Sequence, residues 1–149
     1  MAPRSTAPKP DATAALDLAA LDLASLDLAP GAEAGAAMQL LHPVSAEPLG
    51  ITMTVIGQDA PTYRKNLRKL RDMLAKQGET EEDEDPDRRE VMRLARLSAC
   101  AVRGWAGVQW NGEALPCSFE NAVTLFSALP WIAEQVGFFR DRRANFFKV

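Results

Sequence analysis

Two cysteines and one histidine, Cys100, Cys117 and His42, are the residues of this chain best suited to metal binding or nucleophilic chemistry. A structural zinc site takes about four thiolate, imidazole or carboxylate ligands at short spacings, and these three residues are far apart in the sequence. We therefore expect no metal and no cofactor. His42 begins a turn-rich stretch, and we expect it to be structural or solvent-facing.

The surroundings of each cysteine favour packing over catalysis. Cys100 lies in an apolar segment and is expected to be a small buried side chain. Cys117 directly precedes Ser118, an expected helix N-cap, where a helix dipole could lower a thiol pKa, so redox or catalytic use is the alternative there. The sequence contains no paired carboxylates, glycine-rich phosphate loop or nucleophile–base arrangement. We expect a protein that is not an enzyme, although distant residues could still converge in the fold.

Negative charge is concentrated in one block, Glu79–Asp85, in which six of seven residues are acidic. Such a block repels itself, so it predicts a solvated loop over 78–86, and it lacks the alternating ligands and central glycine of a calcium loop. The formal net charge of −3 argues against nucleic acid as the main partner. Single-stranded nucleic acid is the alternative suggested by the aromatic and basic residues after Phe139.

The first 36 residues differ in composition from the rest of the 149-residue chain. Three copies of a five-residue pattern begin at Leu16, Leu21 and Leu26, each reading Leu-Asp-Leu-Ala. A period of five fits neither a helix nor a strand, so we predict a disordered low-complexity tail over residues 1–36. The alternative is an acidic-hydrophobic segment that folds on a partner. Its contact residues would be Leu16, Leu18, Leu21, Leu23, Leu26 and Leu28.

No apolar run is long enough to predict a membrane span, and the N-terminus lacks the apolar core of a signal peptide. We therefore expect a cytoplasmic protein with reduced cysteines. Residues 37–149 are expected to form a single domain.

The elements of this domain follow from periodicity and turn residues. Alternating residues predict a β-hairpin over 37–57, with Ile51, Met53 and Val55 on one face. A helix is expected over 59–78, with Asp59 as its N-cap, and a second from Pro86 to Gly104.

The final part of the chain contains all three tryptophans and the clearest turn signals. Asn111-Gly112 predicts a second, small hairpin, Ser118 caps a helix, and Pro130 begins another. The predicted fold is α+β and mainly helical: an N-terminal β-hairpin followed by about four helices with a small second hairpin.

These features in this order resemble the tail assembly chaperones of long-tailed bacteriophages and prophages. The resemblance covers roughly residues 38–147 and rests on short motifs. They are Gly57-Gln58-Asp59 with Tyr63-Arg64, Gly104-Trp105, Asn111-Gly112 with Leu115-Pro116, Phe119 to Ala122, Pro130-Trp131-Ile132 with Glu134 to Val136, and Asp141-Arg142 with Ala144 to Phe146. Cys117 departs from the pattern, which has an aromatic or apolar residue there.

The resemblance implies a non-enzymatic protein that binds the helical tape-measure protein in the host cytoplasm and keeps it soluble. It further implies that the protein helps to recruit tail-tube subunits and is absent from the mature virion. Self-association is also possible, and neither membrane nor nucleic acid is expected as a partner. Aromatic side chains are the expected contacts with the partner, although several must belong to the core. The candidates are Trp105, Trp110, Phe119, Phe126, Trp131, Phe138 and Phe139.

Two other functions fit the same sequence. The chain could be a structural virion protein, such as a tail-completion or connector subunit. It could also be a small adaptor whose leucine-rich tail binds a host protein.

Overall fold

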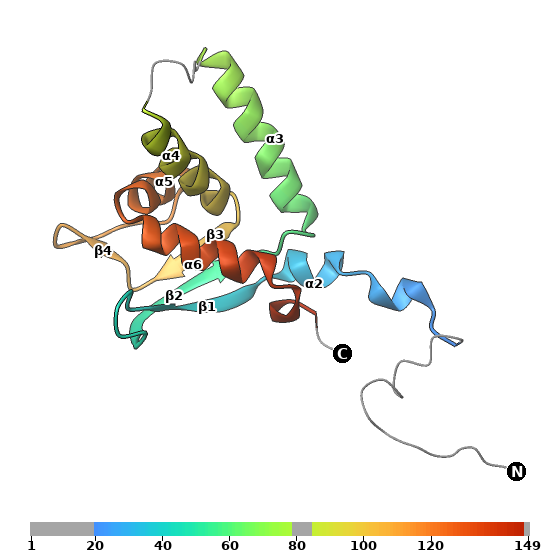
Figure 1. The fold of residues 1–149 in the computed structure, drawn as a ribbon. Helices are drawn as coiled ribbons and strands as arrows, with labels where there is room; N and C mark the ends of the chain where they lie inside the picture. The colour runs from blue at the N-terminus through green and yellow to red at the C-terminus, as the bar shows by residue number, and fades with distance from the viewer. Residues whose placement is uncertain (1–19, 79–84, 148–149) are drawn as a thin grey trace, which may run out of the picture.

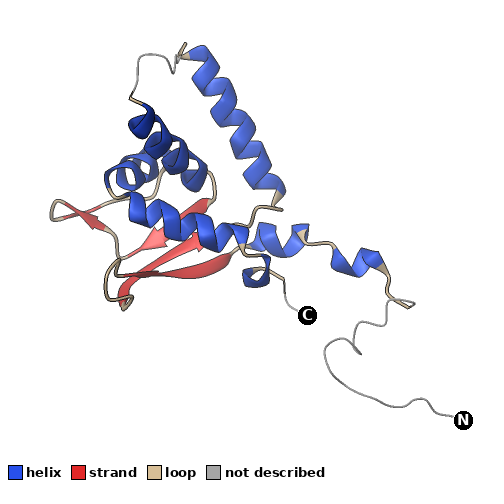
Figure 2. Cartoon of the chain, viewed as in Figure 1, coloured by secondary structure: helices blue, strands red, loops and turns tan. Residues whose placement is uncertain are grey.

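The computed structural model of this chain describes residues 20–78 and 85–147 (Figure 1). The fold is α+β and mainly helical, as predicted, and its longer helices lie on one side of a small antiparallel sheet (Figure 2). Residues 1–19 of the predicted tail and residues 79–84 of the predicted acidic loop lie outside the described residues.

The main sheet has the strand order β1-β2-β3, with both pairs antiparallel. Its strands are β1 (Ala36–Leu41), β2 (Pro48–Val55) and β3 (Val102–Ala106). The first two form the predicted hairpin, and Met53 and Val55 are buried on one face as expected from their alternation. Among the described residues, β1 pairs only with β2, so no strand pairs with its other edge, which is called the free edge below.

Strand β3 was missed by the sequence analysis, which extended the preceding helix to Gly104. Helix α4 (Pro86–Ala99) ends earlier, and Cys100 is its C-cap. Val102 then pairs with Val55 and Gly104 with Thr54, so one additional residue bulges out of β3 between them. Val102 fits the helical stripe of α4 as well as a half-buried strand position, and periodicity alone did not separate the two.

The second hairpin forms as predicted from Asn111-Gly112. Strands β4 (Gln109–Trp110) and β5 (Glu113–Ala114) flank these two residues. Both residues have positive φ values, 54° for Asn111 and 84° for Gly112. This is the backbone geometry that a two-residue hairpin turn requires.

Most helix starts match their sequence signals. A proline lies in the first turn of α3 (Pro61–Lys76), α4 and α6 (Pro130–Asp141). Helix α5 (Phe119–Ala128) is capped by Ser118, whose Oγ accepts a hydrogen bond of 3.1 Å from the Asn121 N–H.

Asp59 was wrongly predicted to cap α3. Ala60 occupies the N-cap position and has no side chain that could accept a hydrogen bond. The Thr62 N–H in the first turn of α3 donates to Glu33 Oε1 at 2.9 Å, so the carboxylate of Glu33 caps this helix end. The Asp59 carboxylate instead accepts two hydrogen bonds, of 2.7 and 3.1 Å, from Arg143 in the short 3₁₀ helix η3 (Arg143–Asn145). These bonds favour the charged carboxylate, so the pKa of Asp59 is lowered.

The described N-terminal residues are ordered further upstream than the predicted boundary at residue 37. They form a 3₁₀ helix, η1 (Leu23–Leu26), and the short helix α2 (Ala29–Ala34). Ala32 is only 2% exposed, and its carbonyl accepts a 3.1 Å hydrogen bond from Gly57 N–H. Helix α2 also meets the end of the described chain, because the Cα of Gly31 lies against the carbonyl of Phe146. The folded domain therefore includes α2.

The core lies between the main sheet and helices α4, α5 and α6. Phe126 at its centre is fully buried, together with Met53, Val55 and Val136. Ser98 is a buried polar residue of this core, and its Oγ donates a 3.0 Å hydrogen bond to the Ala133 carbonyl. That bond joins α4 to α6.

Candidate functional site

The two cysteines lie in environments that disfavour the reactive thiolate. Cys100 is buried, and burial raises the pKa of its thiol to about 11. Partial burial also raises the pKa of Cys117, which is the opposite of what a nucleophile at a helix N-terminus needs. Within residues 20–78 and 85–147, no group of three or more potential metal ligands comes together.

His42 has a structural role at the tip of the first hairpin, as predicted. Its Nδ1 accepts hydrogen bonds from the N–H groups of Val44 and Ser45, at 3.1 and 3.2 Å. The imidazole therefore fixes the turn between β1 and β2.

The seven candidate aromatic residues divide sharply by environment. Phe126 is 0% exposed and is a core residue, so its assignment as a contact residue was wrong. Trp105 packs edge-on against Phe126, with ring centroids 6.4 Å apart, and its Nε1–H donates to the Leu115 carbonyl at 2.7 Å. This indole therefore fixes β3 against the end of the second hairpin.

Four of the remaining aromatic residues are partly buried against the core, and one is not. Phe139 packs edge-on against Phe146, with centroids 5.6 Å apart. Phe138, the residue before it, is 79% exposed. Phe138 lies in the last turn of α6, and such exposure of a large apolar side chain marks this helix as the candidate contact surface. The other three half-buried residues are Trp110, Phe119 and Trp131.

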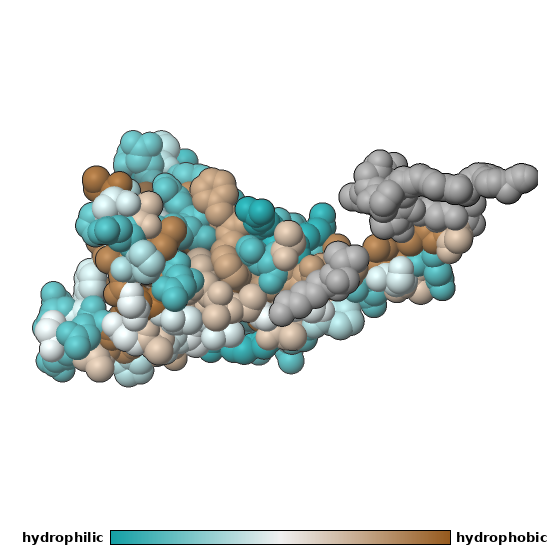
Figure 3. Space-filling model, turned by 90° about the horizontal axis from the view of Figure 1, so that it is seen from below, coloured by the Kyte–Doolittle hydropathy of each residue, from teal (hydrophilic) through white to brown (hydrophobic). Residues whose placement is uncertain are grey.

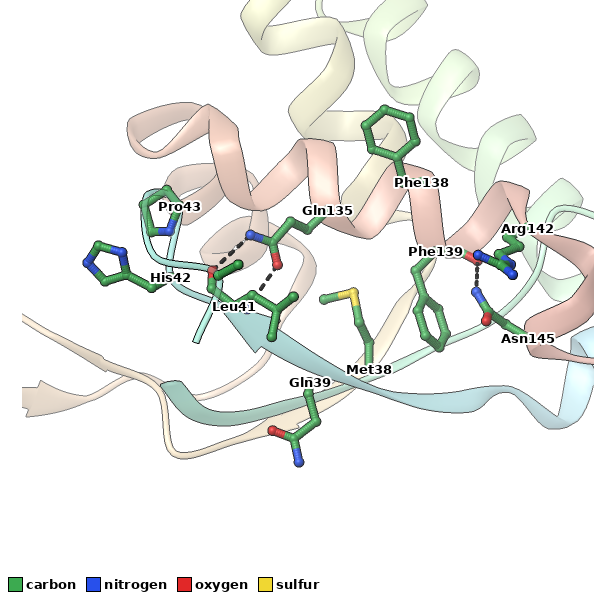
Figure 4. Close-up of a pocket in the computed structure, with 11 residues that line it drawn as sticks. Met38, Gln39, Leu41, His42, Pro43, Gln135, Phe138, Phe139, Arg142 and Asn145 are labelled. Carbon is green, nitrogen blue, oxygen red and sulfur yellow. Dashed lines mark hydrogen bonds between the residues drawn. The ribbon is translucent and has the colours of Figure 1, made fainter. Parts of the chain in front are cut away.

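A groove of about 480 Å³ lies between α6 and β1, and Phe138 is on its rim (Figure 4). Figure 4 shows Phe139 pointing down from α6 toward Met38, while Phe138 rises on the other side of the helix. Most of the lining is apolar or uncharged. The lining residues are Met38, Gln39, Leu41, His42, Pro43, Ala46, Gln135, Phe138, Phe139, Arg142 and Asn145.

Gln135 closes one side of this groove by acting as a partner for the free edge of β1. Its Oε1 accepts from the Leu41 N–H at 3.0 Å, and its Nε2 donates to the Leu41 carbonyl at 2.8 Å. Successive residues of a strand direct their backbone groups to opposite edges, so Ala37 and Gln39 direct theirs to the same free edge as Leu41. The groove therefore combines polar backbone groups of the β1 edge with apolar side chains in one surface.

The groove carries positive charge. Arg142 lines it, and no described lining residue is acidic. The nearby Arg140 is already engaged, because its guanidinium bonds the Asp141 carboxylate at 2.8 and 3.0 Å and lies 5.5 Å from the Tyr63 ring centroid. The positive charge that the groove offers to a partner is therefore that of Arg142.

Phe138 also lines a second, smaller hollow on the other flank of α6. This hollow has a volume of about 190 Å³ and includes Leu94 and Leu97 of α4. Phe138 therefore stands as a ridge between two depressions, a shape that suits insertion between the side chains of a partner helix.

Comparison with known proteins decides the family. The model of the YdaY prophage protein family matches residues 58–147, more than half of the chain. The chain belongs to the YdaY prophage protein family. It is therefore a prophage protein, which agrees with the coarser part of the resemblance in the sequence analysis. No curated protein and no solved structure matches the chain.

The region matched to the YdaY family runs from the end of the first hairpin through η3. It includes the α6 side of the groove, with Gln135, Phe138 and Arg142, whereas the β1 side lies upstream of it. Sequence reasoning selected Phe138 and Phe139 but missed Leu41, Gln135 and Arg142 as parts of the same surface. Gln135 falls on the helical stripe with Trp131 and Phe138, and that spacing was the available signal.

Among the described helices, no single one is long and apolar enough to cross a bilayer. Helices α5 and α6 reach that length and apolar character only when taken together, and the pair is bent by 116°.

Proposed function

We propose that this YdaY-family protein is a non-enzymatic assembly chaperone of phage tails that acts in the host cytoplasm and is absent from the mature virion. It binds the helical tape-measure protein, keeps that protein soluble and helps to recruit tail-tube subunits around it. One observation carries the proposal: Phe138 stands 79% exposed on the rim of a largely apolar groove.

The groove suits the apolar stripe of a long helix. An amphipathic helix binds such grooves through side chains spaced three and four residues apart, and exposed aromatic residues contribute much of the binding energy. Phe138 would insert between successive turns of that helix, while the apolar side chains of the helix cover Leu41, which is 36% exposed. The same contacts would shield the client from aggregation.

The positive charge of the groove favours one kind of client helix. Arg142 lines the groove, and no carboxylate is present among its described lining residues. A client whose apolar stripe is flanked by acidic residues would gain Coulomb attraction at this end of the groove. Membrane and nucleic acid are not proposed as partners, and the raised pKa values of both thiols support structural roles for the cysteines.

Co-expression tests this function. The tagged chain is produced together with the long coiled-coil protein encoded beside it, and the soluble fraction and the pull-down are measured. We expect the client to become soluble and to copurify, and Phe138→Ser to reduce its recovery about tenfold. Leu49→Ser is the matched control, because Leu49 is an exposed apolar residue of β2 that does not line the groove.

The alternatives predict different results. A structural virion subunit would leave the client insoluble and would be present in purified particles. An adaptor acting through its exposed leucines would lose its partner on removal of residues 1–28 and would be insensitive to Phe138→Ser. Either outcome would reject the chaperone function in favour of the corresponding alternative.

A further inference from the structure

The N-terminal arm, defined here as residues 20–28, leaves two large apolar side chains uncovered. Leu23 is 73% exposed and Leu26 is 42% exposed. Their conformation is nevertheless fixed locally: Asp22 Oδ1 accepts from Ala24 N–H at 3.0 Å, and Asp27 Oδ1 accepts from Ala29 N–H at 3.1 Å. The arm is thus a shaped segment that presents leucines to solvent. Figure 3 shows apolar surface along it, at the right of the view.

The leucines of the arm and the groove between α6 and β1 are thus both uncovered apolar surfaces of the described part of the chain. Burying apolar surface is favourable, so two such surfaces on one chain favour contact with each other when their shapes and charges match. The groove has a volume of about 480 Å³ and is open to solvent, so a segment of another chain can reach it.

The charges of the two surfaces are complementary. Residues 20–28 contain two carboxylates, Asp22 and Asp27, and no basic residue. The groove contains Arg142, and its described lining residues include no acid. Docking would therefore bring opposite charges together and would meet no like-charge repulsion.

The arm leaves the domain at α2 and points away from the groove of its own chain (Figure 1). We propose that the arm of one copy docks in the α6–β1 groove of a second copy, with Leu23 and Leu26 against Phe138 and an arm carboxylate beside Arg142. The contact is heterologous, because an arm on one copy meets a groove on the other. Each pair of copies still has one free arm and one free groove, so association continues head to tail unless the assembly closes.

The docking also implies competition for the groove. Arm and client would exclude each other there, so the arm would protect the groove until a client helix displaces it. This competition rests on the proposed function, whereas the docking between copies does not.

Complementation between two full-length variants tests the docking. The arm variant carries Leu23→Asp and Leu26→Asp, and the groove variant carries Phe138→Asp. All three substitutions are at exposed positions, and circular dichroism checks that the fold is kept. Molar mass is then measured by sedimentation at increasing concentrations of wild type, of each variant and of their equimolar mixture.

The expected pattern is specific to an arm-in-groove contact. Wild type gains mass with concentration, and each variant alone stays monomeric. The mixture forms a one-to-one dimer and nothing larger, because it holds one intact groove on one copy and one intact arm on the other. Replacing Asp22 and Asp27 with asparagine should weaken wild-type association about tenfold and reduce its dependence on salt.

Three results would overturn the docking: a monomeric wild type, association that persists in either variant, or a mixture that stays monomeric. Persistence in both variants together with loss in Gln39→Pro would assign the contact to the free edge of β1 instead. If complementation succeeds while the client fails to bind, the proposed function fails and the docking stands. The reverse result rejects the docking and leaves the function intact.

Discussion

The side-chain amide of Gln135 pairs with both backbone groups of Leu41 and so occupies the place of a neighbouring strand at the free edge of β1. The two bonds measure 3.0 and 2.8 Å and join residues 94 positions apart in the chain. Free strand edges invite pairing with other chains, and proteins commonly cover them. Here one side chain of α6 covers the end of the edge and also forms a wall of the groove.

Gln135→Ala should destabilise the domain by about 1 kcal/mol, because it removes both hydrogen bonds to Leu41. Urea unfolding measures this loss in the free energy of unfolding, and amide hydrogen exchange of Leu41 should become faster. Gln39→Ala is the control, since Gln39 is exposed and points away from α6 (Figure 4). Equal effects of the two substitutions would show that Gln135 does not hold the edge.

Phe126→Ala and Phe138→Ala should differ strongly in their effects on stability. Phe126 is fully buried, so truncation leaves a cavity and costs about 3–5 kcal/mol. Phe138 is 79% exposed, so its truncation should change stability by less than about 0.5 kcal/mol. The measurement is chemical denaturation. A large loss of stability in Phe138→Ala would remove that residue from the candidate contact surface.

Ser98→Ala should cost about 1 kcal/mol, because it removes the buried hydrogen bond that joins α4 to the Ala133 carbonyl of α6. Ser98→Val removes the same bond and also adds volume at a buried position between the two helices, so it should cost about 1–3 kcal/mol. Thermal and urea unfolding of the two variants should rank them in that order. A neutral Ser98→Val would mean that the contact between the helices has spare room.

Stability should fall at alkaline pH because of Cys100. Its folded-state pKa is about 11, against an ordinary value of 9.0, so the folded state keeps the thiol proton to higher pH. The stabilisation is complete below pH 9 and is lost as pH rises toward 11. It amounts to about 2–3 kcal/mol at most. Cys100→Ala should flatten the fall of the urea midpoint between pH 8 and roughly 10.5 relative to wild type. Identical profiles would contradict the burial of the thiol.

Gly31→Ala should destabilise the chain, although alanine normally favours a helix by up to about 1 kcal/mol over glycine. The added Cβ would overlap the Phe146 carbonyl, so α2 must move away. Loss of exchange protection at the Gly57 amide, which bonds the Ala32 carbonyl, would report this movement. Gly104→Ala is the control, because a Cβ there meets open space.

Local signals accounted for much of the fold. The alternation ending at Val55, the Asn111-Gly112 turn, the Ser118 cap and the first-turn prolines each specify backbone geometry within a few residues, and each was predicted. Strand β3 depends on a partner in β2, about fifty residues earlier in the chain, and its bulge breaks the simple alternation. Asp59 was misassigned for the same reason, since its actual partner, Arg143, is 84 positions away.

The candidate site was harder to predict, because residues of the same type in similar sequence patterns are buried in one case and exposed in another. Phe126 and Phe138 both lie on apolar helical stripes, and only packing against the sheet and α4 distinguishes core from surface. The groove also joins residues from β1 and α6, a juxtaposition that helical periodicity does not contain. Polar residues such as Gln135 carry no sequence signal for a bond to a distant backbone.

The contact between Gly31 and the Phe146 carbonyl sets an order of events during synthesis on the ribosome. Helix α2 is translated early, but its docking surface includes one of the last described residues. The bond from the Gly57 N–H to the Ala32 carbonyl uses residues that are made much earlier, so the contact with Phe146 is the last of these two attachments to become available. The packing of α2, on which the arm is carried, is therefore completed only after residue 146 has emerged.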